Sequence, residues 1–311
     1  MLGKFLMVIL MILILLFSYI LYQNMPGEPN FLKRDISDED RQASYVNYGD
    51  TPVFRPNLRF ASTDIPYYIE QSCTQNRRNT MIAAFNIFEQ KMEVLNLYES
   101  NYQDAQIYVG CSNDYIELGE RLFAAGEGGP SKILNTSGFK VVQEGKISLY
   151  RSSNCEYPVV EIHELSHVFG FDHSNNPLSI MYNTSDCDQR ITPDMIRIIK
   201  ELYAYESLAD LSIESLTAIK RGRYFDFNIT VVNIGLAAAR NVKLSLTVEG
   251  KVVEEFDMEN VGIGYGKTLQ VTNTALPSRD VTKIDVWIDI DNHIKELNEL
   301  NNHEVLTTEA K

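Results

Sequence analysis

Three histidines and one glutamate in a short stretch have the types and spacing to bind a metal ion and move a proton. The stretch runs from His163 to His173 and reads HELSHVFGFDH. His163 and His167 are four residues apart, so on a helix their side chains lie on one face. Gly170 lets the backbone leave the helix in a left-handed conformation and return with His173 as a third ligand. Three nitrogen ligands leave one coordination position open for water, which is typical of catalytic zinc.

Glu164 follows the first histidine directly and can reach a water on the metal without binding the metal itself. Zinc lowers the pKa of such a water towards roughly 7, and a carboxylate can then accept its proton. The pattern predicts one Zn²⁺ held by His163, His167 and His173, with Glu164 as general base. The alternative is a helix with scattered, hydrogen-bonded histidines, but three of the five histidines in the chain fall at this spacing.

The spacing H-E-x-x-H-x-x-G-x-x-H resembles that of the metzincin metalloproteases. Met181, eight residues after His173, resembles the Met-turn that forms an apolar floor beneath the zinc in that family. Ser174 and Asn183 resemble the matrixin branch more than the astacin branch, as does the segment 191–203. The resemblance implies a zinc endopeptidase whose substrates are peptides or proteins.

One feature of many matrixins is missing from the N-terminal part of the sequence. Those proteins stay latent through a prodomain whose cysteine occupies the open zinc position. No cysteine here precedes Cys73, and residues 23–60 are too few for a folded prodomain. The resemblance therefore does not extend to that form of latency.

The residues around the histidines predict an α+β domain from residue 61 to residue 206, with a twisted sheet and helices behind it. Alternating apolar residues predict strands, and longer periodic segments predict helices. The glycines of residues 126–138 predict a loop, and this loop edge or the following strand is expected to border the substrate cleft. The predicted strands are 64–71, 105–111, 139–142 and 146–150, and the predicted helices are 78–92 and 191–203, the second capped by Thr192.

Four cysteines, all in this domain, predict two disulfides in an extracellular protein. Three pairings are possible. Cys73 with Cys111 would join the ends of two predicted strands, and Cys155 with Cys187 would link the approach to the histidine helix with the segment beyond Met181. Free buried thiols are the alternative, and the absence of a close C-x-x-C pair argues against a zinc site made of cysteines.

Residues 207–311 predict a second domain, an antiparallel β-sandwich of the immunoglobulin-like type. Apolar residues alternate in several short runs, which begin at Phe225, Val242 and Ile284. The segment from Glu296 to Asn302 reads E-x-N-E-x-N-N and resembles the CARDB family of surface-protein modules. The resemblance implies a surface partner for this domain. The acidic and amide residues of 289–302 could bind Ca²⁺, and a solvated turn is the alternative.

An apolar run from residue 5 to residue 22 predicts a transmembrane helix within residues 1–24. Eighteen helical residues span about 27 Å, close to the thickness of the hydrocarbon layer. Lys4 before the run favours an N-terminus inside the cell and domains outside it, although Lys33 and Arg34 weaken the asymmetry. A cleaved signal peptide, which would make the protein secreted, is the alternative. Residues 25–60 are polar and proline-containing, and they predict a stalk or linker.

The net charge of −14 over 311 residues argues against a nucleic-acid partner. The sequence as a whole predicts a membrane-anchored, extracellular zinc endopeptidase with a C-terminal sandwich. Two alternatives remain. A non-catalytic adhesion protein on a protease scaffold would not need Glu164, whereas a hydrolase of a non-peptide amide, such as a cell-wall crosslink, would need the same motif.

Overall fold

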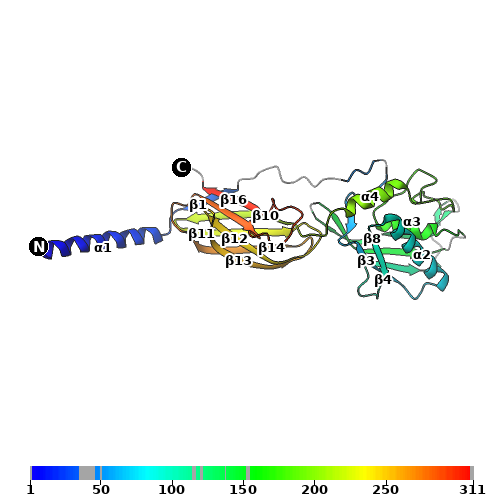
Figure 1. The fold of residues 1–311 in the computed structure, drawn as a ribbon, viewed down its shortest axis with the longest axis horizontal. Helices are drawn as coiled ribbons and strands as arrows, with labels where there is room; N and C mark the ends of the chain where they lie inside the picture. The colour runs from blue at the N-terminus through cyan, green and yellow to red at the C-terminus, as the bar shows by residue number, and fades with distance from the viewer. Residues whose placement is uncertain are drawn as a thin grey trace. The chain divides into compact units, whose positions relative to one another are not determined.

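The computed structural model describes residues 2–34, 46–49, 51–113, 117–119, 122–136, 138–151 and 155–308. The chain forms two compact units. One comprises Ala43–Ser207, and the other comprises Met1–Gln42 together with Leu208–Lys311. Figure 1 shows both units and labels many of their helices and strands.

The unit Ala43–Ser207 is built on a mixed six-stranded sheet, in agreement with the predicted α+β class. Five strands run parallel, and β8 runs antiparallel along β9. A separate pair consists of β6 (Glu117–Gly119) and β7 (Leu122–Phe123). The parallel strands, in spatial order, are β2 (Leu58–Phe60), β9 (Lys140–Leu149), β5 (Ile107–Cys111), β3 (Asp64–Ile69) and β4 (Asn96–Glu99), and the antiparallel strand is β8 (Gly126–Asn135).

Three helices complete this unit: α2 (Gln75–Met92), α3 (Val159–Val168) and α4 (Pro193–Tyr203). α2 packs on the sheet, where the rings of Phe85 and Tyr67 stack with centroids 3.8 Å apart. α4 buries its apolar face in the same core, as the periodicity predicted. Thr192 occupies the N-cap position of α4, but its side chain makes no capping hydrogen bond, contrary to the prediction.

Two predictions for this sheet were wrong. The glycine-rich residues expected to form a loop form strand β8, because Gly126 and Gly128 allow its backbone to lie directly against Glu164 of α3. The two strands expected at 139–142 and 146–150 are one continuous strand, β9, which pairs with β2, β5 and β8. Pairing on both edges holds β9 through Gly145, where a break was predicted.

The two predicted disulfides are present, in one of the three arrangements that four cysteines allow. Cys73 is joined to Cys111 and Cys155 to Cys187, with Cα atoms 4.9 and 5.2 Å apart. The first disulfide links Cys73, two residues before α2, with the end of β5. The second links the approach to α3 with the segment beyond Met181.

The other unit contains an antiparallel β-sandwich, as predicted. Seven strands come from the C-terminal part of the chain and enclose an apolar core that includes Phe225, Ile229, Leu244 and Val286. They are β10 (Leu211–Arg221), β11 (Tyr224–Asn233), β12 (Ala239–Val248), β13 (Lys251–Val261), β14 (Gly266–Ala275), β15 (Lys283–Ile288) and β16 (His303–Thr308).

An eighth strand of the sandwich, β1 (Pro29–Arg34), comes from the segment predicted to be a linker. Residues 29–31 pair with residues 219–221 of β10, and residues 32–34 pair with residues 306–308 of β16. One sheet contains β10, β11 and β14, and the other contains β12, β13, β15 and β16. β1 thus joins the edge strand β10 of the first sheet to the edge strand β16 of the second. The linker prediction was wrong at these residues because their pairing partners lie far away in the sequence.

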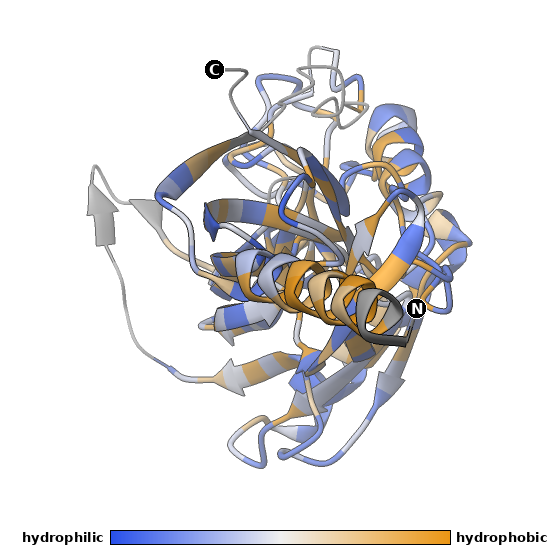
Figure 2. Cartoon of the chain, turned by 90° about the vertical axis from the view of Figure 1, so that its left-hand side faces the viewer, coloured by the Kyte–Doolittle hydropathy of each residue, from blue (hydrophilic) through white to orange (hydrophobic). Residues whose placement is uncertain are grey.

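The chain begins with helix α1 (Leu2–Asn24). Figure 2 shows that its residues are predominantly hydrophobic around the helix. The stretch Leu6–Asn24 is long and apolar enough to cross a membrane, a property that a signal sequence shares.

Candidate metal centre

His163 and His167 lie on one face of α3, as their spacing predicted. Ile162, Leu165 and Val168 bury the opposite side of the helix in the core of the unit. The imidazole rings of the two histidines are 4.7 Å apart at their centroids. The hydrophobic packing of α3 therefore fixes the direction in which both imidazoles point.

A turn after α3 brings the third histidine to the first two. Gly170 has a φ of 94°, and a Cβ atom at this position would lie 2.9 Å from the Leu58 side chain. Only glycine fits both the conformation and the space. After this turn, Nε2 of His173 lies 3.3 Å from Nε2 of His163, which is 3.1 Å from Nε2 of His167.

Backbone carbonyl groups orient two of the imidazoles. Nδ1 of His163 lies 2.6 Å from the carbonyl oxygen of Ile180, and Nδ1 of His167 lies 2.7 Å from that of Phe171. A carbonyl oxygen only accepts hydrogen bonds, so each Nδ1 carries the proton and each Nε2 presents a lone pair. Outer hydrogen bonds of this kind are typical of histidines that bind metals.

The geometry of the three histidines fits a tetrahedral cation. Lone pairs that face each other at these short distances repel unless a cation lies between them. With Zn–N distances of about 2.0–2.1 Å, two nitrogen ligands of a tetrahedral zinc are separated by roughly 3.3–3.4 Å. Among the described residues, these three histidines are the group whose ligand atoms converge in a way that could hold a metal ion.

Burial favours the neutral form of His163 and His167, which metal binding requires. The pKa of His163 is lowered to about 4, mainly by burial and also by the two neighbouring imidazoles, against the opposing effect of the Ile180 carbonyl. Burial also lowers the pKa of His167. Both imidazoles are therefore neutral, and available as ligands, to a lower pH than an ordinary histidine.

Met181 is buried in a turn that is bonded to the residue after His173, while its predicted role as a floor beneath the metal stays a prediction. Its side chain is 1 % exposed, and its carbonyl oxygen accepts a hydrogen bond from the backbone N–H of Ser174 at 2.8 Å. The preceding residue, Ile180, supplies the carbonyl that orients His163. The turn thus contributes a hydrogen-bond acceptor to His163, which was not predicted.

Glu164 is 6 % exposed and lies between α3 and β8. A Cβ atom on Gly126 would be 2.8 Å from Cγ and 3.0 Å from Oε1 of Glu164. Burial, together with the nearby carboxylates of Glu127 and Glu161, raises the pKa of Glu164 to about 8. A dication held by the histidines would oppose this shift, because nearby positive charge favours the ionised carboxylate.

The contact between β8 and α3 was not recognised from the sequence, although a signal was present. Gly126 and Gly128 are two residues apart, so in a strand both face the same side. A Cβ atom on Gly128 would lie 2.0 Å from the carbonyl oxygen of Glu164. Glycines at a period of two often mark a strand against which another backbone packs closely.

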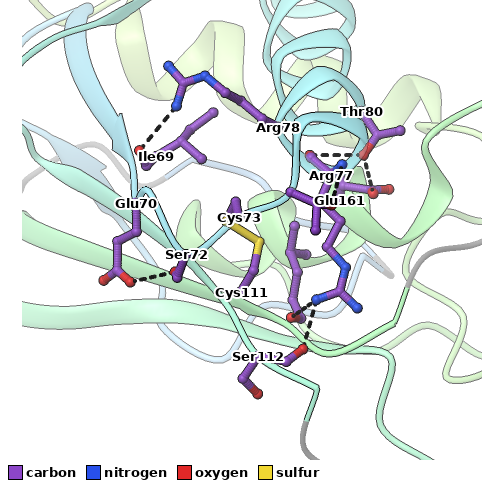
Figure 3. Close-up of a disulfide and its surroundings, with 12 residues drawn as sticks. Ile69, Glu70, Ser72, Cys73, Arg77, Arg78, Thr80, Cys111, Ser112 and Glu161 are labelled. Carbon is purple, nitrogen blue, oxygen red and sulfur yellow. Dashed lines mark hydrogen bonds between the residues drawn. A yellow bond between two sulfur atoms is a disulfide. The ribbon is translucent and has the colours of Figure 1, made fainter.

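Hydrogen bonds join α2 to α3 and to the end of β5 (Figure 3). The hydroxyl of Thr80 on α2 donates a hydrogen bond of 2.8 Å to the carboxylate of Glu161, which is 2 % exposed on α3. Arg77 donates to the carbonyl oxygens of Ser112 and Tyr150 at 2.7 and 2.8 Å, next to the disulfide at the end of β5. These contacts connect α2 to both the sheet and α3.

The acidic segment of residues 289–302 gives no support to the predicted Ca²⁺ site. The carboxylate of Asp289 accepts a hydrogen bond from the backbone N–H of Ile294, and Glu296 accepts from Leu211 and Asn302. Burial raises the pKa of Glu296 to about 7, so part of the negative charge that a calcium ion prefers is lost near neutral pH. A turn held by hydrogen bonds accounts for these contacts, although Asp289 and Glu296 are buried and not solvated as the alternative supposed.

Comparisons with known families and structures match different parts of the chain. Residues 59–204 match the family model for Matrixin, and residues 208–305 match that for CARDB. A search of curated proteins finds no match.

Similar solved structures include two determinations of a CARDB domain and one domain of a cell surface protein. The crystal structure of one from Pyrococcus furiosus, in complex with di-metal ions, is 18% identical and covers 32% of this chain and 88% of its own, with a TM-score of 0.27. The solution structure of the same domain covers 32% and 94% at 18% identity, with a TM-score of 0.25. A domain of a putative cell surface protein from Methanosarcina acetivorans covers 33% and 94% at 21% identity, with a TM-score of 0.27.

Proposed function

Because residues 59–204 form a matrixin domain and residues 208–305 a CARDB domain, we propose that this protein is a membrane-anchored, extracellular zinc endopeptidase. The convergence of three imidazole Nε2 atoms beside a buried glutamate is the observation that carries the proposal. His163, His167 and His173 would hold the zinc, and Glu164 would serve as general acid and base.

Zinc bound there would supply Lewis acidity, which polarises a scissile carbonyl and acidifies water. Glu164 accepts the proton of the attacking water and then donates it to the leaving amine. The Ile180 and Phe171 carbonyls keep the Nε2 lone pairs of His163 and His167 directed at the metal. The contact between Glu164 and Gly126 limits the positions that the carboxylate can adopt.

Strand β8 offers an edge to which an extended peptide could pair. Among the described residues β8 pairs only with β9, so its other edge has backbone groups available for a peptide strand. β8 also lies against Glu164, so a peptide on this edge would pass close to the catalytic group. This arrangement supports peptides as the substrate class over compact small molecules.

The localisation part of the proposal rests on α1 and on the cysteines. α1 has the length and composition of a membrane span, and its last turn makes side-chain contacts with the sandwich that a cleaved segment would not need. All four cysteines are paired, which suits an oxidising compartment outside the cell. Extraction by detergent but not by high salt would support an integral anchor, and release by salt alone would contradict it.

Cleavage of a quenched fluorescent peptide library by the purified protein tests the enzymatic proposal. Activity should disappear with a zinc chelator and return when zinc is added, and elemental analysis should find about one zinc per chain. Replacing the three histidines with alanine should abolish both zinc binding and cleavage. Undiminished zinc in that variant would contradict the site, and activity on cell-wall fragments but not on peptides would favour the non-peptide amide hydrolase.

A further inference from the structure

The last turn of α1 packs against the sandwich instead of leading into a free linker. The guanidinium of Arg279 donates a hydrogen bond to the carbonyl oxygen of Tyr22 and lies 4.4 Å from the centroid of its ring. The backbone N–H of Arg279 donates to the side-chain oxygen of Gln23 at 3.4 Å. One loop of the sandwich therefore caps the carbonyl end of the helix.

A second loop contacts the residues that follow. Arg223 donates to the side-chain oxygen of Asn24 at 3.0 Å, and the hydroxyl of Tyr224 donates to its backbone carbonyl at 3.2 Å. A Cβ atom on Gly27 would lie 2.8 Å from the backbone nitrogen of Gly222, whose φ is 66°. Two glycines thus allow the chain leaving the helix to touch the backbone of the loop.

The sandwich supports both loops from within. Lys220, which is 5 % exposed, donates from Nζ to the carbonyl oxygen of Arg279 at 2.6 Å. Arg223 donates from Nε to the carbonyl oxygen of Leu276 at 3.2 Å. These bonds join residues 221–224 and 276–280 into one surface, which we name the helix-proximal end.

The chain after α1 re-enters the sandwich at once. β1 begins at Pro29, five residues after the end of α1, and pairs first with Arg221, which belongs to the helix-proximal end. The short connection and the side-chain contacts restrain the same part of the sandwich. A loosely tethered domain would show neither feature.

The position of the helix-proximal end along α1 places it at the height of lipid headgroups. The stretch Leu6–Asn24 has 19 residues and spans about 28 Å, close to a hydrocarbon thickness of about 30 Å. Tyr19 and Tyr22 lie in the last turns, where interfacial tyrosines of membrane helices are usual. Side chains that contact Tyr22 and Asn24 must then lie among the headgroups.

The charge of the helix-proximal end suits phosphate groups. Its nine residues contain three arginines and one aspartate, in a chain whose net charge is −14. Arg221 is paired with Asp226, so Arg223 and Arg279 are the arginines that can serve a phosphate. A guanidinium has five N–H donors, so Arg223 and Arg279 can contact the helix and a phosphate oxygen together. Phosphates are present in the headgroups of all common phospholipids.

We propose that the helix-proximal end of the sandwich is a membrane-contact surface that binds phospholipid headgroups through Arg223 and Arg279. The proposal rests on the membrane anchoring proposed above and adds a defined orientation. The sandwich then rests on the bilayer, and the protease unit is attached to it as an insertion. The contact is independent of the chemistry at the histidines.

Depth-dependent fluorescence quenching of the full-length protein in phospholipid nanodiscs tests this surface. All native cysteines are paired, so one added cysteine can carry the fluorophore. The labelled variants are Pro277→Cys in the helix-proximal end and His293→Cys, which is exposed beyond the opposite end of β15. A lipid with a nitroxide headgroup should quench the label at position 277 several-fold more than the label at position 293.

The double variant Arg223→Ala, Arg279→Ala should lose most of this difference, whereas Arg240→Ala, an exposed arginine on β12, should keep it. Equal quenching at both positions, or a double variant that behaves like the parent protein, would overturn the proposal. Failure of the protein to enter nanodiscs would instead overturn the anchor itself, and the surface with it. Cleavage of small peptides should be unchanged in all these variants.

Discussion

At the scale of single residues, the surroundings of Glu164 would link the proposed metal binding to the proposed proton transfer. Its carboxyl group is buried against Gly126, and burial raises its pKa to about 8. A carboxyl group with that pKa is mostly protonated at pH 7 and cannot act as a base. A dication at the histidines would favour the carboxylate, so the base would become competent when the metal binds.

The variant Glu164→Gln should lose peptide cleavage by roughly 10²–10⁴-fold, the usual contribution of a general acid-base group. Glutamine keeps the size of the side chain but cannot accept the proton of water. Zinc content, measured by elemental analysis, and thermal unfolding should be unchanged. Glu156→Gln is the matched control, because Glu156 is exposed and is not one of the carboxylates that shift the pKa of Glu164. A fully active Glu164→Gln variant would remove this residue from the mechanism.

A second buried carboxyl group gives a pH dependence to the sandwich. Burial raises the pKa of Glu296 in the folded state to about 7, above its ordinary value of 4.5. The folded state therefore binds this proton more tightly than the unfolded state, and the resulting stability is complete below pH 4.5. It should decline as the pH rises from 4.5 to 7, by roughly 1–2 kcal/mol.

The variant Glu296→Gln should remove this decline and make the sandwich more stable than the parent protein at pH 8. The glutamine oxygen can accept from the backbone of Leu211, and the amide of Asn302 can rotate to accept from its nitrogen. Chemical denaturation at pH 5 and pH 8 measures the effect. An equal pH dependence in the variant and the parent would contradict the assignment to Glu296.

At the scale of helices and strands, the sequence predicted what local spacing determines. The separation of His163 and His167 places both on one helix face, and Gly170 permits the turn that brings His173 back. Strand β8 was missed because glycine is usually a turn signal, and its role here depends on α3 packing against it. The carbonyl groups that orient His163 and His167 were also missed, since backbone acceptors have no sequence signature.

The contact between β8 and α3 predicts opposite outcomes at two adjacent glycines. In Gly128→Ala the new Cβ atom would lie 2.0 Å from the carbonyl oxygen of Glu164, whereas nothing lies within 4 Å of a Cβ atom at Gly129. Gly128→Ala should destabilise the protease unit by about 1–3 kcal/mol and displace Glu164, with a loss of cleavage. Gly129→Ala should be close to neutral in both respects.

Thermal unfolding and peptide cleavage of the two glycine variants measure this difference. Circular dichroism of the folded variants verifies that the secondary structure is retained. If Gly128→Ala were as stable and as active as Gly129→Ala, β8 would not lie against Glu164 in solution.

At the scale of the whole molecule, the unit that contains the histidines is inserted, in sequence, between the first two strands of the sandwich. β1 precedes residues 43–207, and β10 follows them. The CARDB match of residues 208–305 does not include β1, so this strand adds to the seven strands of the matched domain. No local pattern predicts such a strand, because its partners in β10 and β16 lie about 190 and 275 residues later. The protease unit is thus connected to the sandwich at both of its ends.

Two adjacent residues of β1 test whether this strand stabilises the sandwich. Leu32 is partly buried and packs against the sandwich core, whereas Phe31 is 73% exposed. Leu32→Ser should destabilise the sandwich by about 1–2 kcal/mol, because the burial of the apolar leucine side chain is lost, and Phe31→Ser should have little effect.

Hydrogen exchange of the full-length protein, followed by mass spectrometry, should show faster exchange in β10 and β16 for Leu32→Ser alone. Exchange within residues 43–207 should be unchanged, because that unit has its own core. Equal protection of β10 and β16 in both variants would mean that β1 does not hold the two sheets together.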